Sequence, residues 1–149
     1  MEIASKVPIS ITGKCITNGR TDVEARGKTI IIDEPPQRGG NDLGMSPLET
    51  FFSSYCGCIN VVANVIIEEQ GLDVQISSVD VQGKFLSAAF TGKKNIGVPF
   101  ENMKLIITAK VNCSDEELAK VKDELAWRCP ISATFHAAGM DLAEEWVQT

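Results

Sequence analysis

The sequence has 149 residues, of which 44% are hydrophobic and 23% are charged, and its formal net charge is −6. This length suits a single domain over residues 1–149 that buries most of its apolar surface, and the composition is typical of globular proteins rather than disordered or collagen-like ones. The acidic balance argues against nucleic acid as a partner. No apolar run reaches the roughly 20 residues that span a bilayer, and the opening residues lack the apolar core of a signal peptide. We therefore expect a cytoplasmic protein with no membrane partner.

The first third of the chain predicts strands and then a loop. Apolar residues alternate over 9–17, which is typical of a strand, and the Asn18-Gly19 pair predicts a tight hairpin turn. Two more strands are expected over 20–25 and 29–33. The segment 35–46 is rich in Pro and Gly and predicts a loop.

A long helix follows this loop. Ser46 at the N-cap, Pro47 at the first helical position and Glu49 at the third form a capping box, and Gly71 marks the end of the helix. Its apolar residues lie around most of the circumference. This pattern predicts a helix that is buried as the central helix of the fold or is covered by a second subunit.

The remainder of the chain predicts two strands, two helices and a closing strand. The strands are expected over 74–86 and 103–113, with an exposed loop between them. A second capping box begins at Ser114 and opens an amphipathic helix that runs through Trp127. A short helix over 131–138 and a strand over 140–147 complete the order. Segregated runs of strands and helices predict an α+β fold rather than a parallel α/β sheet.

The chain has five cysteines, and an odd number argues against a structural disulfide framework. Cys15 and Cys113 fall at or near strand ends and are expected to be inert core residues. Cys56 and Cys58 are two residues apart on the long helix, so their side chains point about 200° apart. They cannot form a disulfide with each other, and at most one of them can face a given site.

Cys129 precedes a proline at the start of the short helix. Because helix N-termini stabilise anions and lower thiol pKa values, the local sequence marks Cys129 as the expected thiolate. If it met Cys56 or Cys58 in space, the two thiols could cycle between dithiol and disulfide. A metal site would need Cys113, Cys129 and His136 to converge without the usual ligand spacing, so no metal is expected.

Three other polar residues have structural interpretations. His136 is expected to be structural or exposed, because a thiol–disulfide cycle needs no histidine base. Asp33 and Glu34 flank a strand end and are expected to be surface residues.

Two motifs of the sequence resemble the OsmC/Ohr family of osmotically inducible and organic hydroperoxide resistance proteins. The first is Leu43-Gly44-Met45-Ser46-Pro47-Leu48-Glu49, followed by Cys58 eleven residues after the proline. The second is Arg128-Cys129-Pro130-Ile131-Ser132-Ala133-Thr134. The loop that leads from Asp33 through Gly39-Gly40 is similar to a less characterised branch of the family. The resemblance covers nearly the whole chain.

The resemblance implies an OsmC-like fold with antiparallel sheets around a long buried central helix, in an intertwined homodimer with active sites at the subunit interface. It implies that Cys58 attacks an organic hydroperoxide and that Cys129 then resolves the product as a disulfide. Arg20 corresponds to an arginine that favours the thiolate. No cofactor is implied, and a small thiol or a lipoyl-bearing protein would be the reductant.

One position departs from the family pattern. The family's glutamate that pairs with the arginine directly follows the proline, where this chain has Leu48. Glu49 comes one residue later and lies roughly 180° from Cys58 on the helix, so it either pairs with Arg20 or only caps the helix at Ser46. The role of Cys56 is open as well.

The leading hypothesis is a cytoplasmic thiol-dependent hydroperoxide reductase. A binding or redox-sensing protein with an apolar ligand pocket at the dimer interface is the alternative, with little peroxidase turnover. A structural dimer with idle cysteines is a third interpretation.

Overall fold

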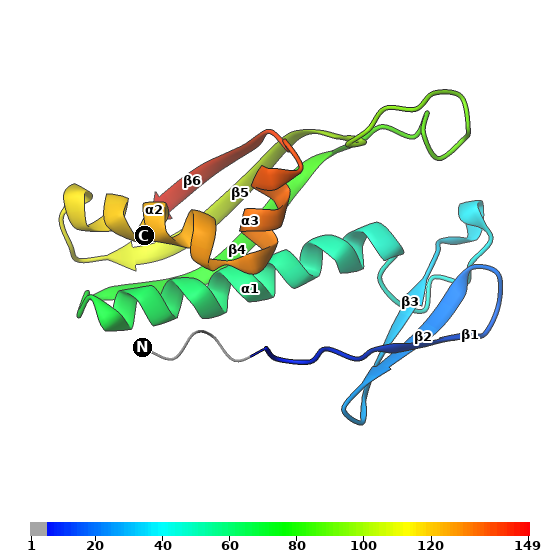
Figure 1. Ribbon diagram of the computed structural model, residues 1–149, viewed down its shortest axis with the longest axis horizontal. Coiled ribbons are helices and arrows are strands. Elements are labelled where there is room, and N and C mark those ends of the chain that lie inside the picture. Colours follow the sequence, from blue (N-terminus) through cyan, green and yellow to red (C-terminus); the bar gives the residue numbers. More distant parts are fainter. Residues whose placement is uncertain (1–5) are drawn as a thin grey trace. The chain divides into compact units, whose positions relative to one another are not determined.

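The computed structural model describes residues 6–149, so the expectation about an N-terminal leader concerns residues that lie partly outside this range. The chain divides into two compact units, one ending at Phe51 and the other running from Phe52 to Thr149 (Figure 1). The elements in chain order are β1 (Thr12–Cys15), β2 (Arg20–Ala25), β3 (Lys28–Asp33), the 3-10 helix η1 (Pro36–Arg38), α1 (Pro47–Glu69), β4 (Val74–Phe85), β5 (Phe100–Val111), α2 (Asp115–Arg128), α3 (Pro130–Ala137) and β6 (Leu142–Gln148). The predicted α+β class is confirmed.

The first unit contains an antiparallel sheet in the order β1-β2-β3. The hydroxyl of Thr17 accepts hydrogen bonds from the backbone N–H groups of Gly19 and Arg20, and these bonds close the predicted hairpin turn. Strand β1 is shorter than expected and is an edge strand with all four residues exposed. The prediction that Cys15 is a core residue is therefore wrong, because Cys15 lies on this edge strand and is exposed within residues 6–149.

The second unit contains a sheet in the order β4-β5-β6. Strands β4 and β5 are antiparallel, whereas β5 and β6 are parallel. The expectation of purely antiparallel sheets is wrong for this pair. The physical reason is the connection: α2 and α3 carry the chain back along the sheet, and a helical crossover of this kind joins parallel strands.

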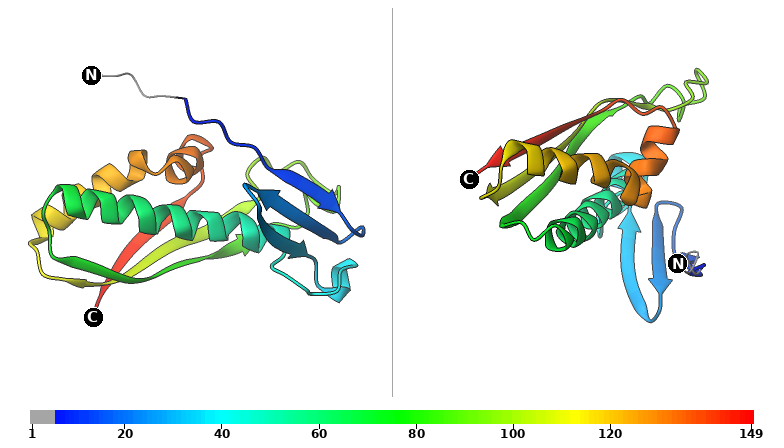
Figure 2. Two further views of the ribbon diagram at one scale, coloured as in Figure 1. Left: turned by 90° about the horizontal axis from the view of Figure 1, so that it is seen from below. Right: turned by 60° about the vertical axis from the view of Figure 1, so that its left-hand side comes forward.

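The three helices of the second unit pack on one face of its sheet (Figure 2). Met103, Leu105, Ile107 and Ala109 of β5 alternate along the strand and are buried against the helices, as a period of two requires. The core includes Tyr55, Ile59, Ala63, Ile66 and Ile67 from α1, Val74 from β4, Met103, Leu105, Ile107 and Ala109 from β5, Val121 and Leu125 from α2, and Cys129, Phe135 and Met140. This layer fixes α1 and α2 against the same sheet.

The boundaries of most elements are close to those expected. The capping box at Ser114 is present in full, and the exposed loop between β4 and β5 is observed. Strand β5 begins at Phe100, three residues earlier than expected. The ring of Phe100 packs edge-on against Phe52 with centroids 5.1 Å apart, which holds the start of the strand on α1.

Helix α1 is buried on one face only in the single chain. Val61 and Val65 lie one turn apart and are 62% and 41% exposed. The expectation of a helix buried all round is therefore not met by this chain alone. By length and mean hydropathy α1 could also cross a membrane, a test that the core helix of a soluble protein passes too.

We predict that Leu125→Ala lowers the free energy of unfolding by about 2–5 kcal/mol, because it leaves a cavity where α2 meets α1 and the sheet. Leu125 is 1% exposed. The matched control on the same helix is Lys120→Ala, which changes an exposed side chain and should alter stability by about 0.5 kcal/mol or less. Urea unfolding followed by circular dichroism measures both, and equal losses would contradict the assigned core.

Candidate thiol site

Two thiols that are 71 residues apart in the sequence meet in the second unit. The Sγ atom of Cys129 donates a hydrogen bond to the Sγ atom of Cys58, and the two atoms are 2.9 Å apart. Cys58 lies in the middle of α1 and is half-buried, and Cys129 is wholly buried. A disulfide bond is about 2.05 Å long, so an approach of roughly 0.9 Å would join the two sulfur atoms.

The α2–α3 corner, which consists of Arg128, Cys129 and Pro130, places the side chain of Cys129 against α1. Cys129 is both the C-cap of α2 and the N-cap of α3, with φ −75° and ψ 114°. Pro130 imposes this extended conformation on the residue before it and starts α3 at its first position. The backbone N–H of Cys129 donates to Leu125, and its Sγ atom accepts the N–H of Ser132 at 3.4 Å.

Cys56 faces away from this pair, as the helical spacing predicted. It lines a shallow groove with Asn60 and residues 76–79 at the start of β4. Burial raises the pKa of the Cys56 thiol, and the charge of Asp80 adds to the effect. Of the two cysteines on α1, only Cys58 contacts Cys129.

The pKa of Cys129 is raised to about 11, mainly by burial and then by the hydrogen bond that its thiol donates to Cys58. The N–H of Ser132 lowers this pKa, but its contact with sulfur is long and does not compensate for lost solvation. The prediction that Cys129 is the thiolate is therefore wrong. Cys129 keeps its proton and offers it to Cys58.

Tyr55 lies near the pair and packs against Phe135, and neither ring was predicted as part of the site. Tyr55 is 1% exposed, and its ring packs edge-on against Phe135 at 5.0 Å. Burial raises the pKa of Tyr55 to about 12, and a hydrogen bond with the side chain of Ser132 opposes this shift in part. Ser132 is three residues after Cys129, a spacing that signals N-cap contact and could have identified it from the sequence.

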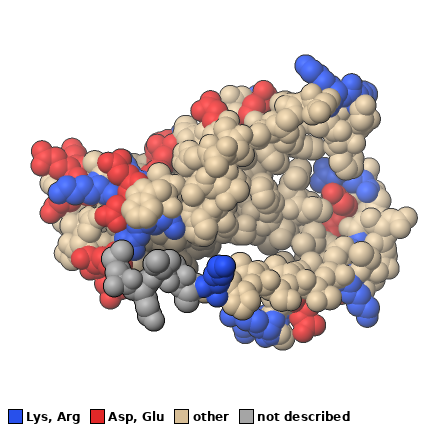
Figure 3. Space-filling view, viewed as in Figure 1, with Lys and Arg blue, Asp and Glu red and all other residues tan. Residues whose placement is uncertain are grey.

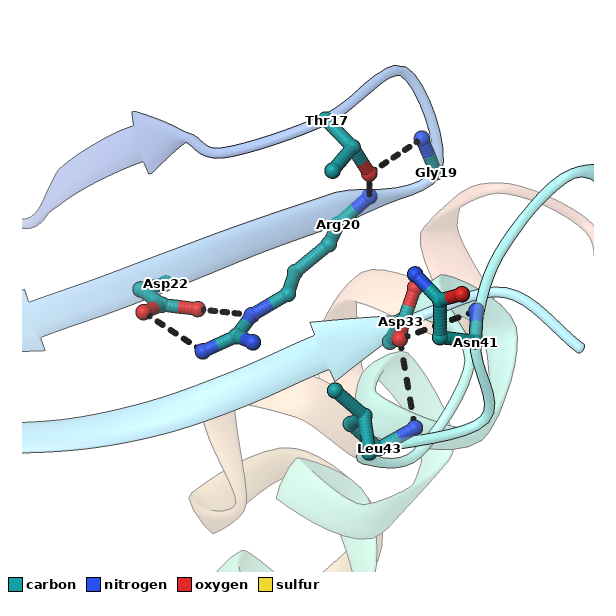
Figure 4. A network of polar contacts seen from close by, with 7 residues as sticks. All are labelled: Thr17, Gly19, Arg20, Asp22, Asp33, Asn41 and Leu43. Carbon is teal, nitrogen blue, oxygen red and sulfur yellow. Dashed lines mark hydrogen bonds and ion pairs between the residues drawn. The ribbon is translucent and has the colours of Figure 1, made fainter.

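Arg20 binds a carboxylate of its own strand in the first unit. Its Nε and Nη2 atoms donate to the two carboxylate oxygens of Asp22 at 2.8 and 3.0 Å (Figure 4). This bidentate bond raises the pKa of Arg20 and lowers the pKa of Asp22. Asp22 was not singled out in the sequence, although residues two apart on a strand share a face.

Glu49 caps α1. Its carboxylate accepts the N–H of Ser46 at 2.7 Å, and its own N–H donates to the hydroxyl of Ser46 at 3.4 Å. The hydrogen bonds from Ser46 lower the pKa of Glu49. Of the two alternatives for this residue, the contacts match the cap, while the guanidinium of Arg20 is held by Asp22.

Asp33 is 0% exposed, so the expectation of a surface residue is wrong. One carboxylate oxygen accepts the N–H groups of Asn41 and Leu43, which folds the loop back over the end of β3 (Figure 4). The other oxygen has no hydrogen-bond partner within residues 6–149. Gly40 permits this close fold, because a Cβ atom there would lie 1.7 Å from the carbonyl oxygen of Glu34.

The remaining candidate residues do not join the thiol pair. His136 is exposed, Glu34 is half-buried and binds Arg38, and burial raises the pKa of the half-buried Cys113. In the described part of the chain, no group of three or more His, Cys, Asp or Glu side chains could hold a metal ion.

The sequence and the structure were both compared with those of known proteins. A family model described as OsmC-like protein matches residues 39–145. An OsmC-like protein from Mycoplasma pneumoniae has a similar structure, with a TM-score of 0.77, 17% identity and coverage of 97% of this chain and 98% of that one. None of the curated proteins matches the sequence.

Two similar structures are described as organic hydroperoxide resistance proteins. The OsmC protein from Legionella pneumophila has a TM-score of 0.68, 15% identity and coverage of 97% of this chain and 99% of that one. The OhrB protein of Bacillus subtilis has a TM-score of 0.63, 14% identity and coverage of 96% and 98% respectively. At these identities the structures establish a shared fold.

We predict that Cys129 reacts slowly with iodoacetamide between pH 7 and 9, because burial and a pKa of about 11 keep it as the thiol in this range. Its labelling should accelerate as the pH rises toward 11, since only then does the thiolate form. Exposed Cys15 is the internal control and should label first. Peptide mass spectrometry of the reduced protein measures both, and equal rates at pH 8 would contradict the assigned environment of Cys129.

Proposed function

The chain belongs to the OsmC family, and we propose that it is a cytoplasmic thiol-dependent hydroperoxide reductase that uses Cys58 and Cys129 as a redox pair. The observation that supports this most directly is the 2.9 Å contact between the two Sγ atoms. The exposed free thiol of Cys15 suits a reducing compartment.

The asymmetry of the pair supports a division of roles. Cys129 is buried, has a raised pKa and donates its proton, whereas Cys58 accepts that hydrogen bond and is half-buried. The more exposed thiol of the pair is the one that a hydroperoxide reaches first. Cys58 is therefore the nucleophile in this proposal, and Cys129 is the resolving thiol.

The cycle has three balanced steps. The Cys58 thiolate attacks the terminal peroxide oxygen, so an S–O bond forms, the O–O bond breaks and an alcohol leaves after protonation of the alkoxide. Cys129 then attacks the sulfur of the Cys58 sulfenic acid, and the disulfide forms with release of water. Two thiol equivalents, from a small thiol or a lipoyl-type dithiol, reduce the disulfide and restore both cysteines.

Organic hydroperoxides are the substrates that this environment favours. Tyr55 lies near the thiol pair and packs against Phe135, which in turn packs against Phe52, so apolar rings belong to the same core cluster as both cysteines. In the proposal Arg20 supplies the cation that stabilises the thiolate and the departing alkoxide. Glu49 acts at the helix start rather than as the partner of Arg20.

We also propose that the chain acts as a homodimer. In the described part of the N-terminal segment, Val7, Ile9 and Ile11 are 78%, 86% and 62% exposed, and the stripe of Val61 and Val65 on α1 is exposed too. Exposed apolar residues in this number favour a protein partner, and a second copy is the partner that the family resemblance implies.

We predict that the purified protein consumes cumene hydroperoxide faster than hydrogen peroxide in the presence of dithiothreitol. Cys58→Ser should lower the rate by on the order of 100-fold or more, because no other group replaces the nucleophile. Cys15→Ser is the matched control and should leave the rate unchanged, since Cys15 is exposed on β1.

Cys129→Ser separates the two roles. Without a reductant it should still consume about one equivalent of hydroperoxide and then accumulate oxidised Cys58 instead of a disulfide. If the wild type consumed no hydroperoxide, the enzyme proposal would fail, and a co-purified apolar ligand in native mass spectrometry would then support the binding alternative.

We predict that light scattering at micromolar concentration gives a mass twice that of one chain. Val61→Glu should shift the mass toward that of one chain, because it places a charge on the exposed apolar stripe of α1. Lys120→Glu, at an exposed position of α2, is the control. A monomeric wild type would contradict the homodimer.

A further inference from the structure

Arg128 is the last residue of α2 and directly precedes Cys129. Its Nη1 atom donates to Glu69 at 2.6 Å and to Glu124 at 2.8 Å, and its Nη2 atom donates to the second carboxylate oxygen of Glu69 at 3.0 Å. Gln70 donates to Glu124 at 2.9 Å. We call Glu69, Gln70, Glu124 and Arg128 the Arg128 network; it joins the C-terminal end of α1 to the C-terminal end of α2.

Glu69 lies at the end of α1 where a carboxylate destabilises the helix, and its partner Arg128 comes from another helix. Helix α1 ends in Glu68-Glu69 with no basic residue in its last turn, and the helix dipole disfavours carboxylates there. The guanidinium of Arg128 offsets this cost and lowers the pKa of Glu69. Because the guanidinium fork is planar, its two parallel bonds to Glu69 fix direction as well as distance.

The network is one of the attachments that hold the α2–α3 corner (residues 128–130) on α1, beside the core packing of Leu125 and the hydrogen bond between Ser132 and Tyr55. On the N-terminal side of Cys129, Arg128 binds Glu69 of α1. On the C-terminal side, the ring of Phe135 packs against Tyr55 and Phe52 of α1, with centroids 5.0 and 6.0 Å away. Cys129 lies between these attachments and faces Cys58 of the same helix. Loss of an attachment gives the corner more freedom to move away from Cys58.

We propose that Arg128 is a positioning residue that keeps Cys129 against Cys58, and that it thereby sets how much of the Cys58 sulfenic acid is resolved rather than over-oxidised. This inference rests on the proposed function. In the resolving branch, the Cys129 thiol attacks the sulfenic sulfur, an S–S bond forms and water leaves. In the competing branch, a second hydroperoxide transfers one oxygen to the sulfenic sulfur, which gives sulfinic acid and an alcohol.

The two branches respond differently to the position of the corner. Resolution is intramolecular and needs the Cβ atoms of Cys58 and Cys129 to lie within about 3.5–4.5 Å of each other. Its rate therefore follows the fraction of time that the α2–α3 corner holds Cys129 against Cys58. Over-oxidation is bimolecular and depends on hydroperoxide concentration. A looser corner therefore lowers the hydroperoxide concentration at which half of Cys58 becomes sulfinic acid, without changing the first attack by Cys58.

The test compares Arg128→Gln with wild type during turnover under dithiothreitol at increasing cumene hydroperoxide. Mass spectrometry measures the sulfinic acid at Cys58 and the Cys58–Cys129 disulfide, and stopped-flow measurement gives the rate of the first attack. We expect the half-point of over-oxidation to fall roughly threefold to tenfold in Arg128→Gln, while the first-attack rate stays within about twofold. Glu69→Gln should reproduce the effect, and Arg128→Lys should be intermediate because an ammonium cannot form the fork.

Lys104→Gln is the matched control, because it removes another partly exposed ion pair of the same unit, with Glu145, away from the corner. The inference would be overturned if Arg128→Gln over-oxidised at the same concentration as wild type and Lys104→Gln. It would also be overturned if the first attack slowed as much as resolution. If wild type formed no Cys58–Cys129 disulfide at all, the proposed function itself would fail.

Discussion

The contact between Cys58 and Cys129 depends on the rigid attachment of one helical corner to α1. The two cysteines are 71 residues apart in the sequence, so the sheet must first place α1 and α2 on the same face. Leu125 and Val121 fix α2 on that layer, and Pro130 then turns the chain so that the thiol of Cys129 faces α1. The rings of the second unit and the Arg128 network keep the corner there. Figure 3 shows acidic and basic side chains in small groups on the face in view, with uncharged side chains between them. The ion pairs of Arg128 with Glu69 and Glu124 involve the residue directly before Cys129.

Burial decides which of the two thiols holds its proton. A helix N-terminus favours a thiolate at Cys129, and the backbone N–H groups of Ser132, at 3.4 Å from the sulfur, and of Ile131 both act in that direction. Loss of solvation and donation to Cys58 act in the opposite direction and prevail, so the pKa of Cys129 rises. Since a raised pKa means that folding favours the protonated thiol, the unfolded chain loses this proton first, near its ordinary pKa of about 8.5. The contribution of Cys129 to stability is therefore complete below about pH 8.5 and declines as the pH rises toward 11.

Local signals in the sequence predicted most elements and helix caps. The features that the sequence did not predict depend on contacts between residues far apart in the chain. The boxes at Ser46 and Ser114 depend on residues three apart, and the opposed directions of Cys56 and Cys58 follow from helical geometry alone. The parallel pairing of β5 with β6 and the burial of Asp33 depend on segments that return from elsewhere in the chain. The pKa of Cys129 was missed for the same reason, because its main cause is packing and not the helix to which it belongs.

Glu49 and Arg20 each bind a partner that is close to them in the sequence. Glu49 is nine residues before Cys58, and its carboxylate lies at the start of its own helix, where it accepts a hydrogen bond from the backbone N–H of Ser46. Arg20 instead binds Asp22, which lies two residues away on the same face of β2, and the nearby charge of Asp33 adds to the electrostatic stabilisation. Asp33 is also the cross-strand neighbour of Arg20. The orientation and charge of Arg20 are thus set within the β1-β2-β3 sheet and do not require any carboxylate of α1. For this reason the departure from the family pattern at Leu48 is compatible with a charged, oriented arginine.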